Sequence, residues 1–278
     1  MTVTGLSSPR QPGLKGVAKG AARTIGLRRN SLAAARMQIE RTSLARVGRR
    51  TTLHGRVLCY HSVGTPEWGV NDVTPAQFRT QLEAALDAGY RFVPANEIAE
   101  GAASRRNLAV TFDDGIASVA TNAAPVLASL TIPWALFVVT DWADGRHAMA
   151  DGIVLGWREI ERLAQQGAQI GSHSLSHPRF SSLSSAEAAR EVIDSKRVLE
   201  SRLGIQIDTF AIPFGQSNDW LPAHTELARA AGYRHIYAQS QTRRPEGTIG
   251  RTFVTRFDTP AIFAAALQGR FDNWEEWV

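Results

Sequence analysis

The chain has 278 residues, 44% of them hydrophobic and 21% charged, which suits one large α/β domain or two small ones. Its single cysteine, Cys59, excludes a small scaffold held together by internal disulfides. The net charge of +5 is uneven, because residues 1–50 hold eleven Lys and Arg and one acid, a net charge of +10. The rest of the chain is therefore acidic.

The first 54 residues are predicted to form a basic N-terminal arm, helical or disordered, ahead of the folded domain. No apolar run of signal-peptide length follows Arg10, and no stretch of about 20 apolar residues could form a transmembrane helix. The arm can be a solvated, partly helical tail or a helix on an anionic membrane surface. Nucleic-acid binding is not expected, because no aromatic residue precedes Tyr60. We expect a cytoplasmic protein or one peripheral to the inner membrane face.

From Gly55 onward, predicted strands and helices alternate. Short apolar runs predict strands over 56–61, 90–94, 107–115, 133–140, 168–173, 209–215, 234–239 and 251–257. Capped segments predict helices over 74–89, 118–130, 157–167, 184–204, 222–232 and 260–269. About seven such units in roughly 220 residues favour a closed β/α barrel over an open sheet, so residues 55–278 are predicted to form one domain.

Three polar motifs follow predicted strands. They are T-F-D-D-G (111–115), H-S-L-S-H (173–177) and P-F-G (213–215). The carboxyl ends of barrel strands share one face, and that face carries the chemistry. We therefore expect the three motifs to meet there.

The first two motifs together predict a metal site. On one helical turn His173 and His177 would present both imidazoles on one face, with Pro178 ending the turn. Two imidazoles and one carboxylate of Asp113 or Asp114 make a three-ligand site with an open position, as in catalytic zinc sites. The other carboxylate can accept a proton from water, whose pKa a cation lowers from about 15.7 to about 7. Either motif alone would be weak evidence for metal binding, since such histidine pairs and Asp-Asp-Gly turns are common.

The remaining histidines are less informative. His61 ends the first strand and should reach the same face of the barrel, whereas His235 begins a strand and should lie at the opposite face. Cys59 is expected in the core. Surface positions are predicted for His54, His147 and His224. Three tryptophans, Trp68, Trp142 and Trp220, fall in predicted loops, where they can either stack on sugar rings or pack in the protein interior.

Residues 56–269 resemble the polysaccharide deacetylases, the NodB-homology family or carbohydrate esterase family 4. The resemblance rests on Y-H-S-V (60–63), T-F-D-D-G, G-S-H-S-L-S-H (171–177), P-F-G and A-G-Y (231–233). It implies a distorted (β/α) barrel and a metal-dependent hydrolase, commonly with zinc, that removes acetyl groups from sugars. It also implies roles for five residues. Asp113 would be the general base, Asp114, His173 and His177 the metal ligands, and the backbone N–H near Phe214 an oxyanion donor.

The chain departs from the family pattern at two places. Many members carry an arginine two residues before the motif proline, which orients the general base, and this position is Ala211 here. Many members also carry a histidine late in the barrel as general acid, but the last predicted strand has none, and Arg256 and Asp258 stand near that place. We hypothesise that His61 supplies the missing general acid, or that Asp113 itself protonates the leaving group. Substrate contacts are predicted for Pro213, Gly215, Trp220 and Arg256.

The leading prediction is a metal-dependent hydrolase, with zinc as the expected metal, that removes acetyl groups from a glycan or a glycan precursor. The favoured reaction is hydrolysis of the carbon–nitrogen bond of an N-acetyl group. The missing arginine and histidine motivate an alternative, a catalytically silent glycan-binding barrel. A deacylase of a non-sugar amide is a third possibility, because fold and metal do not fix the substrate.

Overall fold

The computed structural model describes residues 34–51, 54–146 and 150–275. It divides into two compact units, Met1–Glu40 and Arg41–Val278. Residues 34–47 are helical, and the rest of the predicted arm before residue 34 lies outside the described residues. None of the described helices is long and apolar enough to cross a membrane.

The larger unit begins at Arg41, earlier than the boundary after residue 54 that the composition suggested. Arg41 is fully buried, and its Nε and Nη2 donate to the carboxylate of Asp258 at 2.6 and 2.5 Å. Its Nη2 also donates to the carbonyl of Phe253 at 3.1 Å. One arginine of the predicted arm is therefore an internal residue of the larger unit.

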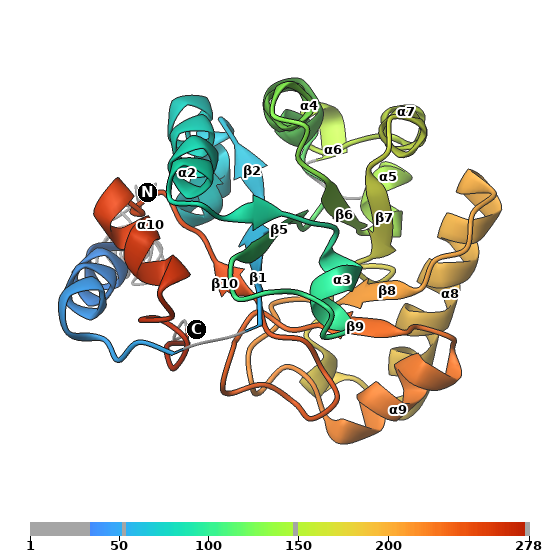
Figure 1. The fold of residues 1–278 in the computed structure, drawn as a ribbon. Coiled ribbons are helices and arrows are strands. Elements are labelled where there is room, and N and C mark those ends of the chain that lie inside the picture. The colour runs from blue at the N-terminus through green and yellow to red at the C-terminus, as the bar shows by residue number, and fades with distance from the viewer. Residues whose placement is uncertain (1–33, 52–53, 147–149, 276–278) are drawn as a thin grey trace, which may run out of the picture. The chain divides into compact units, whose positions relative to one another are not determined.

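A curved parallel sheet forms the centre of this unit, with strands in the order β10-β1-β5-β6-β7-β8-β9 (Figure 1). A short strand, β4, pairs with β5 beside this path. The strands are β1 (Arg56–Tyr60), β4 (Arg91–Phe92), β5 (Asn107–Phe112), β6 (Trp134–Val138), β7 (Gln169–Ser172), β8 (Thr209–Ala211), β9 (His235–Tyr237) and β10 (Thr252–Phe253). Ile249 bridges to Tyr237 of β9, and four residues later Phe253 pairs with Cys59 of β1. The segment from 249 to 253 thus connects the two ends of the sheet, and the predicted distorted barrel is confirmed.

The longer helices also follow the prediction. They are α2 (Pro75–Asp87), α4 (Ala124–Ser129), α7 (Trp157–Gln165), α8 (Ser185–Leu203), α9 (Pro222–Ala230) and α10 (Pro260–Leu267). Their ends are set locally: the Thr74 side chain accepts the N–H of Gln77, and Ser184 and Glu187 form a capping box at the start of α8. Gly204 ends α8 at φ +64°, a conformation that glycine adopts without strain.

Several short elements were not predicted. The most important for the site is the 62–73 insertion, which consists of β2 (Ser62–Val63), the 3-10 helix η1 (Pro66–Asn71) and β3 (Asp72–Val73). The others include α3 (Ala95–Ala99), α5 (Thr140–Ala143), α6 (Ala150–Ile153) and the 3-10 helix η3 (Phe180–Ser182). They are too short to carry a periodic apolar pattern.

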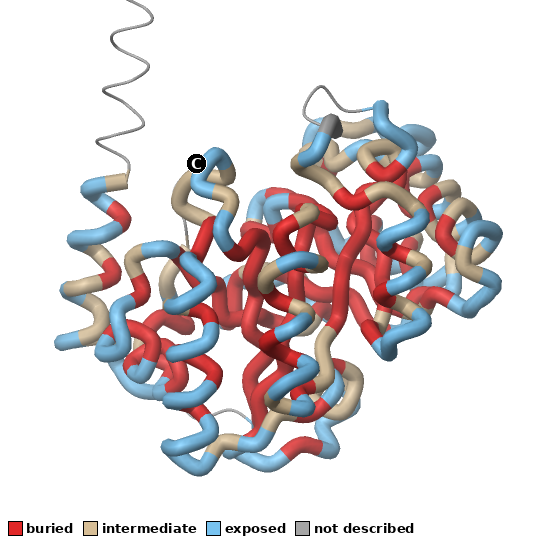
Figure 2. The backbone as a smooth tube through the Cα atoms, turned by 90° about the horizontal axis from the view of Figure 1, so that it is seen from above, coloured by how far each residue is buried: buried red, intermediate tan, exposed pale blue. Residues whose placement is uncertain are grey.

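Buried positions run along the strands, while exposed positions gather on the outer sides of the helices (Figure 2). Trp220 belongs to this interior, with 2% of its surface exposed. Its ring packs 4.7 Å from Phe180 and 5.5 Å from Phe210 between centroids, and its Nε1 donates to Thr225. The expectation that Trp220 contacts substrate is therefore wrong, because its ring and its polar atom are both used inside the protein.

His224 is also buried, contrary to the predicted surface position. Its Nδ1 accepts the N–H of Leu221 at 3.1 Å and so helps to begin α9. His54 is exposed as predicted, and His147 lies outside the described residues. His235 begins β9, with its Nε2 3.5 Å from Glu100.

Candidate active site

A pocket of about 360 Å³ opens at the carboxyl ends of the strands. All six residues predicted as catalytic or metal-binding line it: His61, Asp113, Asp114, His173, His177 and Phe214. Six further lining residues were not assigned a role from the motifs, namely Glu67, Trp68, Asn71, Trp142, Gln216 and Gln239. The barrel thus brings together six predicted site residues that are spread over 153 positions of the sequence, from His61 to Phe214.

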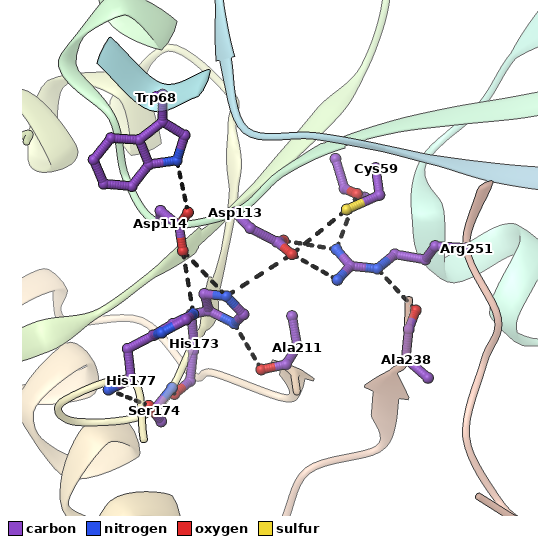
Figure 3. A network of polar contacts seen from close by, with 12 residues as sticks. Cys59, Trp68, Asp113, Asp114, His173, Ser174, His177, Ala211, Ala238 and Arg251 are labelled. Atoms are coloured by element: carbon purple, nitrogen blue, oxygen red, sulfur yellow. Dashed lines mark hydrogen bonds and ion pairs between the residues drawn. The ribbon is translucent and has the colours of Figure 1, made fainter. Parts of the chain in front are cut away.

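Three potential ligand atoms converge in this pocket (Figure 3). Asp114 Oδ1 lies 3.4 Å from Nε2 of His173 and 3.4 Å from Nε2 of His177. Asp114 Oδ1 is buried and has no hydrogen-bond partner. A buried acceptor without a partner is costly unless something positive satisfies it. Two imidazole nitrogens and one carboxylate oxygen in this arrangement fit a divalent cation such as zinc.

The histidines do not lie on a helical turn, so that part of the prediction is wrong. The backbone is left-handed at Ser174 (φ +71°) and at His177 (φ +63°), and residues 173–179 are irregular. Side chains hold this loop in place of a helical hydrogen-bond ladder. The Ser174 hydroxyl accepts the N–H of His177, and buried Glu191 of α8 accepts the backbone N–H groups of residues 175 and 176, both at 2.9 Å.

Backbone strain is concentrated at the site. Among the described residues, five non-glycine positions have positive φ, and four of them are in these motifs: Asp114, Ser174, His177 and Phe214. Such conformations cost on the order of 1–3 kcal/mol each and persist only where the surrounding structure imposes them. The strained backbone is consistent with side chains that are held for function.

The ring of His173 is held in orientation by its Nδ1 atom. Its Nδ1 lies 2.8 Å from the carbonyl oxygen of Ala211, so Nδ1–H donates and the Nε2 lone pair points toward Asp114. Burial opposes a charge on His173, but Asp113 and Asp114 raise its pKa above the ordinary value. For His177 burial dominates and lowers the pKa to about 4, which leaves the neutral imidazole that metals bind.

Arg251 holds Asp113 by two hydrogen bonds. Nη1 and Nη2 of Arg251 donate to Oδ1 and Oδ2 of Asp113, each at 2.6 Å, and both side chains are buried (Figure 3). Burial works to raise the pKa of Asp113, but Arg251 and His173 lower it to about 2. The carboxylate is therefore ionised and fixed in orientation.

Arg251 was not identified from the sequence. It begins the predicted strand 251–257, and no role was assigned to it. The observed strand β10 contains only Thr252 and Phe253, so Arg251 lies close to the functional face. Its guanidinium is further tied by Nε to the carbonyl of Ala238 at 3.1 Å.

Cys59 and His61 complete the surroundings of Asp113. The Cys59 thiol donates to Asp113 Oδ2 at 3.5 Å, and burial raises the pKa of the thiol, so it stays protonated. Burial lowers the pKa of His61, whose ring stands edge-on to Phe253 at 5.6 Å. His61 lines the pocket, as its place at the end of the first strand predicted.

The other predicted substrate contacts have different outcomes. Arg256 is exposed and is not among the residues that line the pocket. Pro213 and Gly215 shape the turn that presents Phe214: Gly215 N–H donates to the Pro213 carbonyl at 2.7 Å. A Cβ on Gly215 would stand 2.7 Å from the backbone nitrogen of Gln239, so this position requires glycine.

Comparison with known proteins agrees with this geometry. A model of the polysaccharide deacetylase family matches residues 100–236, a stretch that contains all three polar motifs. Residues 100–236 carry a domain of the polysaccharide deacetylase family. Its members are hydrolases that act on N-acetyl groups of polysaccharides.

Two deacetylases of Bacillus subtilis are similar to this chain at low sequence identity. YxkH of Bacillus subtilis, assigned to the polysaccharide deacetylases, is 22% identical over 213 residues, which cover 71% of this chain and 74% of YxkH. The peptidoglycan-N-acetylmuramic acid deacetylase PdaC of the same organism is 26% identical over 130 residues, 45% of this chain and 25% of PdaC.

Two solved structures share the fold of this deacetylase. IcaB from Ammonifex degensii is similar with a TM-score of 0.66 and 27% identity, over 78% of this chain and 98% of IcaB. The deacetylase PplD of Streptococcus pyogenes has a TM-score of 0.67 at 19% identity, over 79% of this chain and 99% of PplD.

Proposed function

We propose that this protein is a metal-dependent de-N-acetylase of a glycan, with Asp114, His173 and His177 as metal ligands and Asp113 as general base. The observation that carries the proposal is the convergence of the three ligand atoms beside a carboxylate that is fixed by Arg251. One carboxylate of the Asp-Asp pair faces the imidazoles, and the other faces the guanidinium. The two therefore have separate roles.

A divalent cation held by these ligands would polarise the acetyl carbonyl and lower the pKa of the attacking water. Asp113 accepts the proton of that water, and its ionised state at neutral pH suits this step. The backbone N–H of Phe214 is the proposed donor to the developing oxyanion. The neighbouring N–H of Gly215 is already bonded to Pro213.

His61 is proposed to carry the proton to the leaving amine. Because burial lowers its pKa, its imidazole is neutral at pH 7 and can take up the proton that Asp113 has accepted. One of its ring nitrogens lies within 4.8 Å of a carboxylate oxygen of Asp113. His61→Ala should lower turnover about 100-fold or more while leaving bound metal unchanged. Unchanged turnover would leave Asp113 as the sole proton carrier.

The test of the function measures metal content and acetate release together. The purified protein is assayed on N-acetylglucosamine oligomers and on peptidoglycan, the latter because the relative PdaC is named as a peptidoglycan-N-acetylmuramic acid deacetylase. We expect about one metal per chain and acetate release that a chelator abolishes. Asp113→Asn should lose acetate release and keep the metal, whereas His173→Ala should lose both. Asp144→Asn and His54→Ala, which change surface groups of the same kinds, serve as matched controls.

A chain that binds metal stoichiometrically and releases acetate from none of these glycans would overturn the proposed substrate class. In that case the same protein is assayed on simple acetamides, since a non-sugar amide is the competing substrate. A chain without metal would overturn the site itself.

We also propose that the basic arm attracts anionic lipid, at about 1 kcal/mol for each Lys or Arg near the surface. Removal of residues 1–33 tests this proposal and leaves Arg41 in the barrel. Binding to vesicles that contain phosphatidylserine should fall sharply, while acetate release in solution stays unchanged. Equal vesicle binding by the full and shortened chains would refute the proposal.

A further inference from the structure

We infer that Trp68 is a positioning residue of the metal site, which holds the Asp114 carboxylate in the orientation that binds the cation. Trp68 is not part of any of the three polar motifs. Its indole Nε1 donates to Asp114 Oδ2 at 3.1 Å (Figure 3). The inference rests on the metal site of the proposed function and not on the identity of the glycan.

The two oxygens of Asp114 have different surroundings. Oδ2 accepts the Trp68 hydrogen bond, whereas Oδ1 has no partner and lies 3.4 Å from Nε2 of both His173 and His177. A carboxylate bonded at one oxygen cannot rotate without losing that bond. Trp68 therefore keeps Oδ1 directed toward the two imidazoles.

The other two ligands have restraints of their own. His173 is fixed through Nδ1 by the Ala211 carbonyl. The His177 ring lies between aromatic rings, with centroids 5.3 Å from Trp142 and 4.8 Å from Phe214. The Asp114 carboxylate is restrained by the hydrogen bond that it accepts from Trp68 Nε1. Outer partners of this kind typically account for a 10- to 100-fold difference in metal affinity.

The 62–73 insertion holds Trp68 firmly enough for this role. Asp72 Oδ1 accepts from the Ser62 hydroxyl at 2.8 Å and from the Thr65 N–H at 2.7 Å, which ties the two ends of the insertion together. The Trp68 N–H donates to the Thr65 carbonyl at 2.9 Å. Gly69 follows with φ +71° and ψ −129°, a conformation that only glycine adopts readily, so the chain turns directly after the indole.

Trp68 also lines the pocket and meets Trp142 edge-on at 6.1 Å between centroids. A residue that served only as an aromatic wall would act through its ring and not through its N–H. Trp68→Phe separates these roles, because it keeps an aromatic face and removes the donor.

The experiment measures zinc affinity by competition with a chromophoric chelator, using the full chain. Trp68→Phe should bind zinc about 10-fold or more weakly than the wild type and release it faster to excess chelator. Trp157→Phe is the matched control, since Trp157 Nε1 donates to Asp144 at 2.7 Å outside the pocket. The control should have wild-type zinc affinity.

Zinc affinity of Trp68→Phe within twofold of the wild type would overturn the inference, even if its KM for a glycan rises. Should Trp68→Phe fail to fold, benzothienylalanine at position 68 makes the same test, because it replaces the indole N–H with sulfur and keeps the ring size. A wild type that binds zinc and hydrolyses no glycan would refute the proposed function while leaving this inference open to the same measurement.

Discussion

Arg251→Met removes the guanidinium that holds Asp113, and we expect it to destabilise the fold strongly. The two side chains are 0% and 4% exposed, and they share two hydrogen bonds of 2.6 Å. Loss of one partner leaves the other as an uncompensated buried charge, which costs about 3–5 kcal/mol. The free energy of unfolding should therefore fall by about 3–5 kcal/mol at pH 7, and acetate release should be lost with the orientation of Asp113.

The pKa of Asp113 provides a second estimate of how strongly its surroundings stabilise the ionised carboxylate. Despite burial, the pKa drops from 3.8 to about 2, which corresponds to roughly 2.5 kcal/mol in favour of the ionised folded state at about 1.4 kcal/mol per unit. In the wild type this contribution is present above pH 4 and is lost as the pH falls toward 2. Without Arg251, burial raises the pKa instead, so the folded variant takes up a proton before the unfolded chain does. The stability deficit of Arg251→Met should then shrink as the pH falls from 7 to about 4.

The assay is urea unfolding of chelator-treated protein at several pH values, with the double variant Arg251→Met/Asp113→Asn beside the single one. The double variant should be more stable than Arg251→Met, because it has no buried charge left over. Arg79→Met is the control: Arg79 pairs with Glu83 on the surface at 45% and 47% exposure, where a pair is worth about 1 kcal/mol or less. A loss in Arg251→Met no larger than in this control, or a deficit that does not change with pH, would refute the reasoning.

Three further predictions concern parts of the barrel away from the reacting atoms. Arg41→Met should lower the unfolding free energy by about 3–5 kcal/mol, because Asp258 stays buried without its partner; chemical denaturation measures this. Burial lowers the pKa of His224 in the folded protein. As the pH falls below about 6.5, the imidazole of His224 is therefore protonated in the unfolded chain before it is protonated in the folded one, and the free energy of unfolding declines. His224→Gln should flatten that decline in unfolding curves recorded between pH 7 and pH 5. Gly171→Ala places a Cβ 2.5 Å from the Phe137 ring, which should cost about 1–3 kcal/mol and lower the melting temperature.

Much of the fold could be predicted because its signals are local. Strand β5 has six buried residues, four of them apolar, and the residues that begin and end α8 can be recognised in the sequence as Ser184, Glu187 and Gly204. The order of these elements, together with the rule that parallel strands direct their carboxyl ends to one face, was enough to bring Asp113 and His173 together. The 62–73 insertion carries no such signal, because its structure depends on Asp72 bonding to residues up to ten positions earlier.

Some predictions failed where packing outweighed the local pattern. Trp220 follows a turn-forming stretch and so resembles an exposed loop tryptophan, yet Phe180 and Phe210 enclose it from distant elements. Arg41 belongs by charge to a basic arm, yet Asp258 binds it 217 residues later. In both cases the decisive partner is remote in the sequence, and neither composition nor periodicity reports it.

The missing arginine of the third motif illustrates the same point at the candidate active site. Ala211 cannot orient Asp113 through its side chain, but its carbonyl fixes His173, and the guanidinium comes from Arg251 instead. This substitution is possible because β10 has only two residues, so the long side chain of Arg251, directly before β10, reaches Asp113 directly after β5. The Arg251 guanidinium lies 5.5 Å from the Phe137 ring, which packs in one cluster with Ala211. A small residue at 211 and an arginine at 251 are therefore two parts of one arrangement, and the absence of the motif arginine is no argument for an inactive barrel.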